Sequence, residues 1–488
     1  MTKYEPVIGL EVHAEMMTES KMFCGCRVVD SVEVPPNTAV CPVCLGMPGM
    51  LPVINRRAME FAMRVALALN CTIQPGNVFA RKNYFYPDLP KAYQISQYEL
   101  PMATNGWLDI ALESGERRRI HIRRVHMEED TGKLTHLEDG TGSLVDFNRS
   151  GVPLLEIVSE PDMHTIEEAR VYAMKLRQIL RYLEVNSGDM EKGVIRFEAN
   201  VSIRPSGSQT LGTRTEIKNL NSFRALSDGI AYEVERQTAV LDAGEEVVQD
   251  TMGWSESRQQ TFSQRGKEEA HDYRYFPEPD LPPIQVGESW IDAVRAALPE
   301  LPESKQRRYE TDFGLTAYEA GVLVEDRLVA EWFDTAVAAG GDPRTVSNWL
   351  INVLFSLMNE YKQSIADIKV TPESLVELIT LVDKTVINNN TAKEVLGEMF
   401  QSGRAAKVIV EARGLVQISD ESLLEETIAQ ILADNPEQVA IYLGGKDGLQ
   451  GWFVGQVMRA TRGKANPAVV NHLLDNQLDH LRNLAAED

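Results

Sequence analysis

The chain has 488 residues, of which 43% are hydrophobic and 25% charged, and its 72 acidic and 49 basic side chains give a formal net charge of −23. This balance is typical of a folded globular protein and excludes a disordered tail protein, a fibrous protein and a disulfide-stapled miniprotein. The acidic total disfavours a protein that simply coats nucleic acid. No apolar run reaches the roughly 20 residues that span a bilayer, and the N-terminus lacks the pattern of a signal peptide, so we expect a cytoplasmic protein.

Alternation of apolar and polar residues predicts strands with one buried and one open face. Residues 8–15 alternate in this way, and Glu11 and His13 share the polar face. Residues 195–204 and 214–218 alternate too, and together they predict a hairpin. Its polar face carries Glu198, Arg204, Glu216 and Lys218.

Helices are interleaved with these strands. Thr165 and Glu168 form a capping box that predicts the start of a helix. Mixed strands and helices predict an α+β fold with an open antiparallel sheet. From about Ser304 the pattern is helical. Within this part, Thr391 and Glu394 predict another capping box, and Gly403 predicts the end of that helix.

The composition of the chain and its proline-containing linker predict three domains. A proline-containing linker near residue 299 ends the part that holds the strands, and a further boundary falls near residue 411. We therefore expect a mixed domain at 1–295, a helical domain at 296–410 and a small helical tail at 411–488.

Four of the five cysteines fall in two tight pairs, Cys24-x-Cys26 and Cys41-x2-Cys44. Four thiolates on two short turns suit a tetrahedral zinc ion, and with no open position such a site is structural. The plain alternative is two accidental pairs of core cysteines. Cys71 lies in an apolar helical pattern and is expected to be a buried bystander.

Acidic residues gather on the predicted strands. Glu128, Glu129 and Asp130 follow His126 at the end of one strand, and Glu156 interrupts an apolar run, where a carboxylate is costly to bury without a partner. Together with Glu11 and His13 these carboxylates suit a hard cation such as Mg²⁺. The plain alternative is a solvated sheet face with mixed charges.

Three further segments combine basic and aromatic residues. Residues 82–94 form a loop that either stacks on a base or packs internally. Residues 117–124 carry five arginines, which either contact a phosphate backbone or pair with neighbouring acids. The basic, glycine-punctuated stretch 451–464 is a candidate RNA contact. Neither a P-loop nor a Rossmann fingerprint is present.

Eight motifs follow one another along the chain: IGLEVHAEM, CPVCLGMPGMLPVIN, RKNYFYPDLPKAYQISQYE, HMEEDTGK, DFNRSGVPLLEIVSEPD, FEANVSIRP, TEIKNLNSF and EEAHDYRYFPEPDL. Through them the chain resembles, over its whole length, the B subunits of the tRNA-dependent amidotransferases (GatB). The resemblance implies an N-terminal cradle similar to glutamine synthetase, then a helical domain and a tail that help to hold tRNA.

The resemblance also implies the activity. The protein would use ATP and Mg²⁺ to phosphorylate the side-chain carboxylate of Glu or Asp misacylated on tRNA(Gln) or tRNA(Asn). Ammonia from the glutaminase A subunit would then displace phosphate, with a small C subunit as third partner. By motif, the magnesium ligands would be Glu11, His13, Glu129 (with Glu128 as the alternative) and Glu156. The residues that line the nucleotide and phosphate side would be Glu198, Arg204, Glu216 and Lys218.

Three other functions compete with this one: a self-contained zinc hydrolase, a non-catalytic tRNA-binding scaffold, and a free enzyme of the glutamine-synthetase type. The hydrolase requires a zinc ion with an open position. The scaffold requires that loss of Glu11 leaves activity intact. The free enzyme requires ATP turnover with free glutamate and no tRNA.

Overall fold

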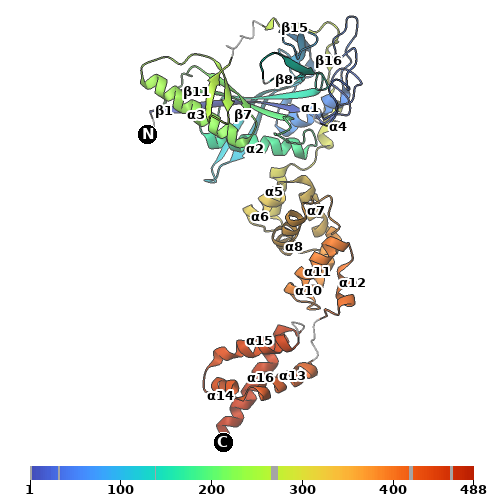
Figure 1. The fold of residues 1–488 in the computed structure, drawn as a ribbon, viewed down its shortest axis with the longest axis vertical. Helices are drawn as coiled ribbons and strands as arrows, with labels where there is room; N and C mark the ends of the chain where they lie inside the picture. Colours follow the sequence, from blue (N-terminus) through green and yellow to red (C-terminus); the bar gives the residue numbers. More distant parts are fainter. Residues whose placement is uncertain are drawn as a thin grey trace. The chain divides into compact units, whose positions relative to one another are not determined.

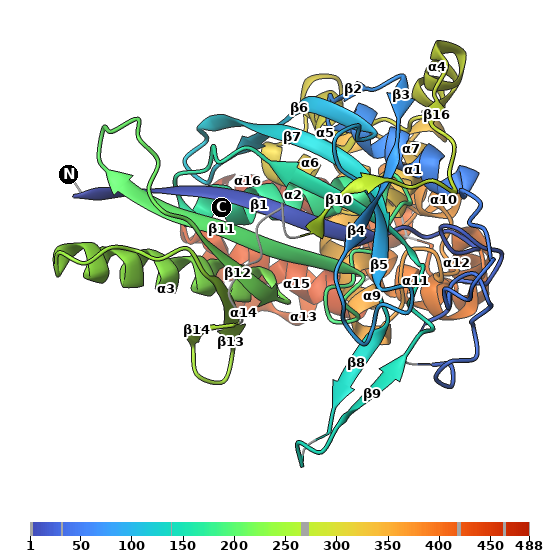
Figure 2. The same ribbon diagram turned by 90° about the horizontal axis from the view of Figure 1, so that it is seen from above.

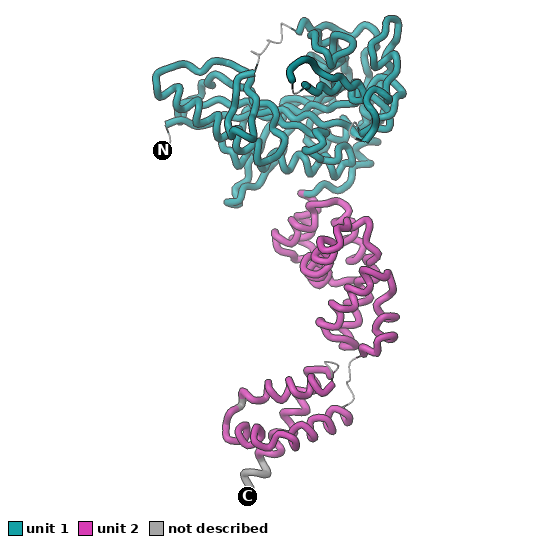
Figure 3. The backbone as a smooth tube through the Cα atoms, in the orientation of Figure 1, with its two compact units in different colours: residues 1–302 teal, residues 303–488 magenta. Residues whose placement is uncertain are grey.

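The computed structural model describes residues 3–30, 33–137, 139–264, 273–416, 421–461 and 465–487. The chain divides into two compact units, Met1–Pro302 and Glu303–Asp488 (Figure 3). The first unit holds every described strand, and the second is built from helices (Figure 1). The predicted α+β class is therefore confirmed.

The main sheet of the first unit has twelve strands, ten of them in the order β14-β13-β12-β11-β1-β10-β7-β5-β4-β15, while β6 pairs with β7 and β2. Two short pairs, β3–β16 and β8–β9, stand apart from it. The strands are β1 (Tyr4–Glu15), β2 (Thr72–Ile73), β3 (Gly76–Asn77), β4 (Phe79–Asn83), β5 (Tyr93–Gln97), β6 (Ala103–Ala111), β7 (Arg117–Glu129), β8 (Lys133–His136), β9 (Ser143–Asp146), β10 (Pro153–Ser159), β11 (Ile195–Pro205), β12 (Thr215–Leu220), β13 (Thr251–Ser255), β14 (Gln260–Ser263), β15 (Phe276–Pro277) and β16 (Ile284–Gln285).

Strand β1 lies between β10 and β11 and is antiparallel to both (Figure 2). Its even-numbered residues from Ile8 to Ala14 are fully buried, as the alternation predicted for residues 8–15 requires. Helices α1 (Arg56–Ala68), α2 (Ile166–Tyr182) and α3 (Phe223–Asp242) cover this apolar face and complete one hydrophobic core (Figure 1). The opposite face keeps the polar side chains and carries the site described below.

The expected hairpin is present, since β11 pairs antiparallel with β12. The sheet departs from the expected antiparallel pattern at one pair, because β12 and β13 run parallel. Helix α3 connects these two strands, and a crossover of that length is what parallel pairing requires. The likeness to glutamine synthetase stays a prediction.

The second unit contains two separate hydrophobic cores, one within residues 309–410 and one within residues 424–478. The expected domain limits stay a prediction, although the first unit ends at Pro302. The remaining helices are α4 (Glu288–Ala296), α5 (Pro302–Thr311), α6 (Ala317–Leu323), α7 (Arg327–Ala338), α8 (Pro343–Trp349), a π-helical turn η2 (Leu350–Leu354), α9 (Phe355–Tyr361), α10 (Pro372–Asp383), α11 (Asn389–Ser402), α12 (Ala406–Arg413), α13 (Glu421–Asp434), α14 (Pro436–Leu443), a 3-10 turn η3 (Asp447–Leu449), α15 (Gln450–Ala460) and α16 (Pro467–Glu487).

The capping box of Thr165 and Glu168 is confirmed at the start of α2, and Gly403 ends α11 with a left-handed φ of 73°. The box expected from Thr391 and Glu394 is wrong. Asn388 is the N-cap of α11, and its side chain accepts a hydrogen bond from the backbone N–H of Thr391. The helix therefore begins at its N-cap Asn388, within one turn before the predicted cap at Thr391.

Across the parts of the chain that the structure describes, no helix combines the length and apolar character that crossing a membrane demands.

Candidate functional site

The polar face of the sheet brings a first group of metal-ligating side chains together from three strands. His13 on β1 lies opposite Glu156 on β10, which lies opposite His126 on β7. His13 Nε2 is 3.4 Å from Glu156 Oε2 and 3.9 Å from Glu128 Oε1. Ligand atoms of His13, Glu128 and Glu156 all lie within 4.8 Å of one another.

A second group lies beside the first. Glu11 is two residues before His13 on β1, roughly 7 Å along the strand, and faces Glu198 on β11. Oxygens of Glu11, Glu198 and Glu216 again lie within 4.8 Å of one another. Lys218 Nζ donates a hydrogen bond to Glu198 Oε2 at 2.8 Å and is 4.0 Å from Glu216 Oε1.

These groups shift one another's pKa values. Burial lowers the pKa of His13, but the carboxylates of Glu156, Glu198 and Glu128 outweigh burial and raise it to about 9. Burial raises the pKa of Glu156, but the two imidazoles beside it hold it well below the ordinary value. In the same way, Lys218 and His13 outweigh burial and lower the pKa of Glu198.

Two buried oxygen atoms of this face lack a partner that a cation could supply. Within the described residues, Glu128 Oε2 and Asn200 Oδ1 are buried and have no hydrogen-bond partner. Such atoms are rare in folded proteins and costly unless a ligand satisfies them. Carboxylate oxygens with one imidazole are ligands that Mg²⁺ accepts, so His13, Glu128 and Glu156, and beside them Glu11, Glu198 and Glu216, could hold it.

Glu129, expected as a ligand, does not join these groups. Successive side chains of a strand point to opposite faces, and Glu128 is the one beside His13. Glu129 accepts hydrogen bonds from Lys91 Nζ at 2.6 Å and from the backbone N–H of Ile95 at 2.9 Å. The motif leaves open whether Glu128 or Glu129 is the metal ligand, and the geometry favours Glu128.

Arg204 is also placed apart from the two groups. It lies six residues after Glu198 on β11, roughly 20 Å along the strand, and its Nε donates to Glu5 Oε1 at 2.6 Å. The structure thus brings together Glu11, Glu198, Glu216 and Lys218 and leaves Arg204 outside.

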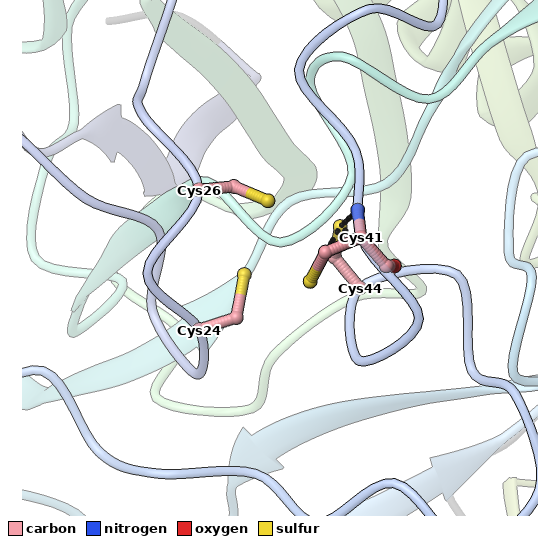
Figure 4. Close-up of side chains that lie close together, drawn as sticks. All are labelled: Cys24, Cys26, Cys41 and Cys44. Atoms are coloured by element: carbon pink, nitrogen blue, oxygen red, sulfur yellow. Dashed lines mark hydrogen bonds between the residues drawn. The ribbon is translucent and has the colours of Figure 1, made fainter.

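The four paired cysteines form a compact cluster (Figure 4). Cys24 and Cys26 lie on one loop and Cys41 and Cys44 on a second loop that faces it, and all four sulfurs lie within 4.8 Å of one another. The sulfurs of Cys41 and Cys44 are 3.9 Å apart. Bonds of about 2.3 Å in a tetrahedron place sulfurs about 3.8 Å apart, so the donors and their spacing fit zinc.

The thiols of the cluster differ in pKa. A hydrogen bond from the Cys24 thiol outweighs burial and lowers the pKa of Cys44 to about 4. The same hydrogen bond raises the pKa of Cys24, and burial raises the pKa of Cys26 to about 11. The cysteines are not disulfide-bonded. Cys71 lies apart and is buried, as expected.

The arginines of β7 form ion pairs with neighbouring acids, which is the second of the two roles expected for them. Arg119 forms a bidentate hydrogen bond with Asp109, and Arg123 forms one with Glu160. This strand therefore pairs with neighbouring acids.

The aromatic loop packs internally in part. The Tyr84 ring packs edge to face on Tyr273, while Phe85 and Tyr86 are exposed, and stacking on a base stays a prediction. In the last motif, residues 268–272 lie outside the described residues, and so do residues 462–464 of the basic tail stretch.

Several further residues of the polar face were not among the expected magnesium ligands. His126 Nε2 lies 3.1 Å from Glu156 Oε2, and Arg196 Nη2 donates to Asp130 Oδ2 at 2.6 Å. Burial and the charge of Asp130 raise the pKa of Glu15 to about 8. The period-two spacing of residues 126, 128 and 130, and of 11, 13 and 15, is the signal that points to them.

Together, an open sheet face with two groups of residues that could hold a hard cation, a lysine beside the carboxylates of the second group and a separate four-cysteine cluster characterise an α+β protein with a candidate site on an open sheet. Two family models match the chain: "GatB/GatE catalytic domain" over residues 6–292 and "GatB domain" over residues 331–478.

Curated relatives match nearly the full length. The B subunit of an aspartyl/glutamyl-tRNA(Asn/Gln) amidotransferase from Moorella thermoacetica is 55% identical over 479 residues, which cover 98% of this chain and 100% of the relative. Proteins of the same name from Thermodesulfovibrio yellowstonii and Brevibacillus brevis are each 52% identical, covering 97% and 99% of this chain and 98% and 100% of their own lengths. The chain belongs to the family of amidotransferase B subunits.

Proposed function

We propose that this chain activates and amidates the aminoacyl group of misacylated tRNA. It phosphorylates the side-chain carboxylate of Glu-tRNA(Gln), Asp-tRNA(Asn) or both, with ATP as phosphoryl donor. Ammonia then displaces the phosphate and forms the amide. The substrates follow the name of the relatives, which refers to aspartyl and glutamyl groups on tRNA(Asn) and tRNA(Gln).

The chemistry explains why a phosphorylating site is needed. Ammonia does not displace an oxygen from a carboxylate, because the oxide is too poor a leaving group. Transfer of the γ-phosphoryl group of ATP to that oxygen gives an acyl phosphate and ADP. Attack by ammonia then breaks the carbon–oxygen bond, and inorganic phosphate leaves as the amide forms.

The observation that carries the proposal is the pair of ligand groups on one open face. Bringing ATP to a carboxylate places two anions together, so catalysis depends on positioning and on positive charge. The two ligand groups would hold Mg²⁺, which would supply positive charge beside the phosphate groups. Lys218, hydrogen-bonded to Glu198, adds a fixed cation at the same place.

The same proposal assigns the partners and the remaining metal. The relatives are named as one lettered component of an amidotransferase, which implies an enzyme of several subunits. We propose a glutaminase A subunit as the ammonia source and a small C subunit as third component. We further propose that Cys24, Cys26, Cys41 and Cys44 hold a structural zinc ion. The five unpaired cysteines suit the reducing cytoplasm, where we place the protein.

ADP release by the co-expressed complex tests the proposal. We expect release with Glu-tRNA(Gln) or Asp-tRNA(Asn), and none with uncharged tRNA or without tRNA. Glu11→Gln should lower the rate by about 100-fold or more, a typical loss for a charge-stabilising group, with tRNA binding retained. Glu5→Gln, on the same strand but paired with Arg204, is the matched control and should keep the rate.

The competing functions are outcomes of this assay. Full activity of Glu11→Gln makes the chain a tRNA-binding scaffold. ADP release with free glutamate and no tRNA makes it an enzyme of the glutamine-synthetase type. Hydrolysis that depends on zinc and not on ATP makes it a zinc hydrolase.

A further inference from the structure

Lys21 is a wholly buried lysine beside the cysteine cluster, with an exposed fraction of 0%. Its Nζ lies 3.8 Å from the Sγ of Cys44 and 3.3 Å from the carbonyl oxygen of Phe147. In the parts of the chain that the structure describes, no carboxylate forms an ion pair with it. The carboxylate of Glu129, which also lies beside Gly151, is held by Lys91 instead.

A buried ammonium needs an anion, because an unpaired charge in the interior costs several kcal/mol or shifts to its neutral form. The hydrogen bond to Phe147 supplies a dipole but no charge. The sulfur of Cys44 is the group beside Lys21 that carries a negative charge as a thiolate. The buried ammonium therefore lies directly beside a sulfur that would bind zinc as a thiolate.

Gly151 lies directly beside this contact. A Cβ placed on it would lie 3.4 Å from the Cβ of Cys44 and 3.6 Å from the Cδ of Lys21, which are ordinary van der Waals distances. The φ of +84°, and not a lack of space, therefore favours glycine at this position.

We propose that Lys21 is the internal counter-charge of the cysteine cluster, with its ammonium donating a hydrogen bond to the Cys44 thiolate of the zinc site. This proposal rests on the zinc site proposed above. Four thiolates and one Zn²⁺ leave two excess negative charges. An ammonium at one sulfur lowers this charge and makes that sulfur a poorer target for protons and oxidants, so the zinc is held longer.

Zinc release from the purified complex tests the role of Lys21. We would measure bound zinc, and then the rate at which zinc transfers to a coloured chelator with and without hydrogen peroxide. Lys21→Met should release zinc about 10–100-fold faster, the typical effect of removing a partner of a metal ligand. Lys21→Arg keeps the charge and should stay close to the unaltered chain.

Two more variants make the test specific. Lys21→Gln keeps an N–H donor without the charge, and it decides the question should Lys21→Met fail to fold. Lys305→Met is the matched control, because Lys305 is also buried but pairs with Asp334 at 2.6 Å in the second unit. The control should lower stability and leave zinc release unchanged.

The outcomes separate the two proposals. Faster release from Lys21→Met and Lys21→Gln supports the counter-charge. One zinc per chain with unchanged release in a folded neutral variant overturns the role of Lys21 alone. No zinc in the unaltered chain overturns the zinc site and the role of Lys21 with it.

Discussion

Glu128 and Glu129 are consecutive residues of β7, yet Glu128 Oε1 lies 3.9 Å from His13 Nε2 while Glu129 is held by Lys91 at 2.6 Å. The strand thus joins the proposed magnesium groups on one side to the surroundings of the cysteine cluster on the other. The two carboxylates have different environments, so their loss should have different effects.

We expect Glu128→Gln to weaken Mn²⁺ binding, measured by electron paramagnetic resonance, by at least about tenfold, because a ligand is lost. Glu129→Gln should leave Mn²⁺ affinity unchanged and lower the free energy of unfolding by about 3–5 kcal/mol, because Lys91 keeps a buried charge without its partner. The reverse pattern would restore Glu129 as the ligand.

His13 should make the metal-free chain less stable as the pH rises. Its pKa in the folded chain, about 9, lies above the ordinary value of 6.5, so the folded chain keeps a proton that the unfolded chain loses. The stabilisation is complete below pH 6.5 and is lost as the pH rises through about 9. Urea unfolding of the unaltered chain and of His13→Gln between about pH 6 and pH 9 measures it. A stability difference between them that does not shrink toward the upper end of this range would contradict the assignment.

Lys218 and Arg204 should differ in their effect on ADP release. Lys218→Met removes the cation between Glu198 and Glu216 and should slow release by about 100-fold. Arg204→Met breaks a pair with Glu5 outside the two ligand groups and should change the rate little. Equal losses in both variants would mean that the nucleotide reaches along β11 to Arg204.

Cys24→Ser should lose the bound zinc, measured by elemental analysis, and melt at a lower temperature, because zinc binding adds to folding free energy. Cys71→Ser is the control, since Cys71 is buried away from the cluster, and it should keep one zinc per chain. A Cys24→Ser protein with full zinc content would remove Cys24 from the site.

Asn388 should matter more than Thr391 to the stability of α11. Asn388→Ala removes the N-cap and should lower the free energy of unfolding of the second unit by about 1 kcal/mol. Thr391→Ala, within the first turn, should cost less. Denaturant unfolding followed by circular dichroism compares the two.

Much of the architecture follows from the sequence, because a period of two fixes which face of a strand is buried. The alternation of Leu10 and Val12 with Glu11 and His13 correctly predicts the polar face of β1. The alternation does not determine which strands, far apart along the chain, lie side by side in the sheet. No local signal places β10 beside β1, and so none brings Glu156 to His13.

Other departures have their own physical causes. The parallel pair β12–β13 depends on how α3 crosses the sheet, which periodicity does not encode. Adjacent acids such as Glu128 and Glu129 are distinguished only once the register of β7 is known. The sequence predicts the start of α11 too late because asparagine and threonine both cap helices, and the backbone decides between them.

The central place of β1 has a consequence for synthesis on the ribosome. Glu11 lies opposite Glu198, so β1 is synthesised well before β11 and waits for it before it can pair on that side. During this interval β1 has unpaired backbone groups, a condition that favours wrong pairing between nascent chains. Its acidic side chains repel those of another copy of the strand, so we expect the same carboxylates that we assign to catalysis to oppose such pairing.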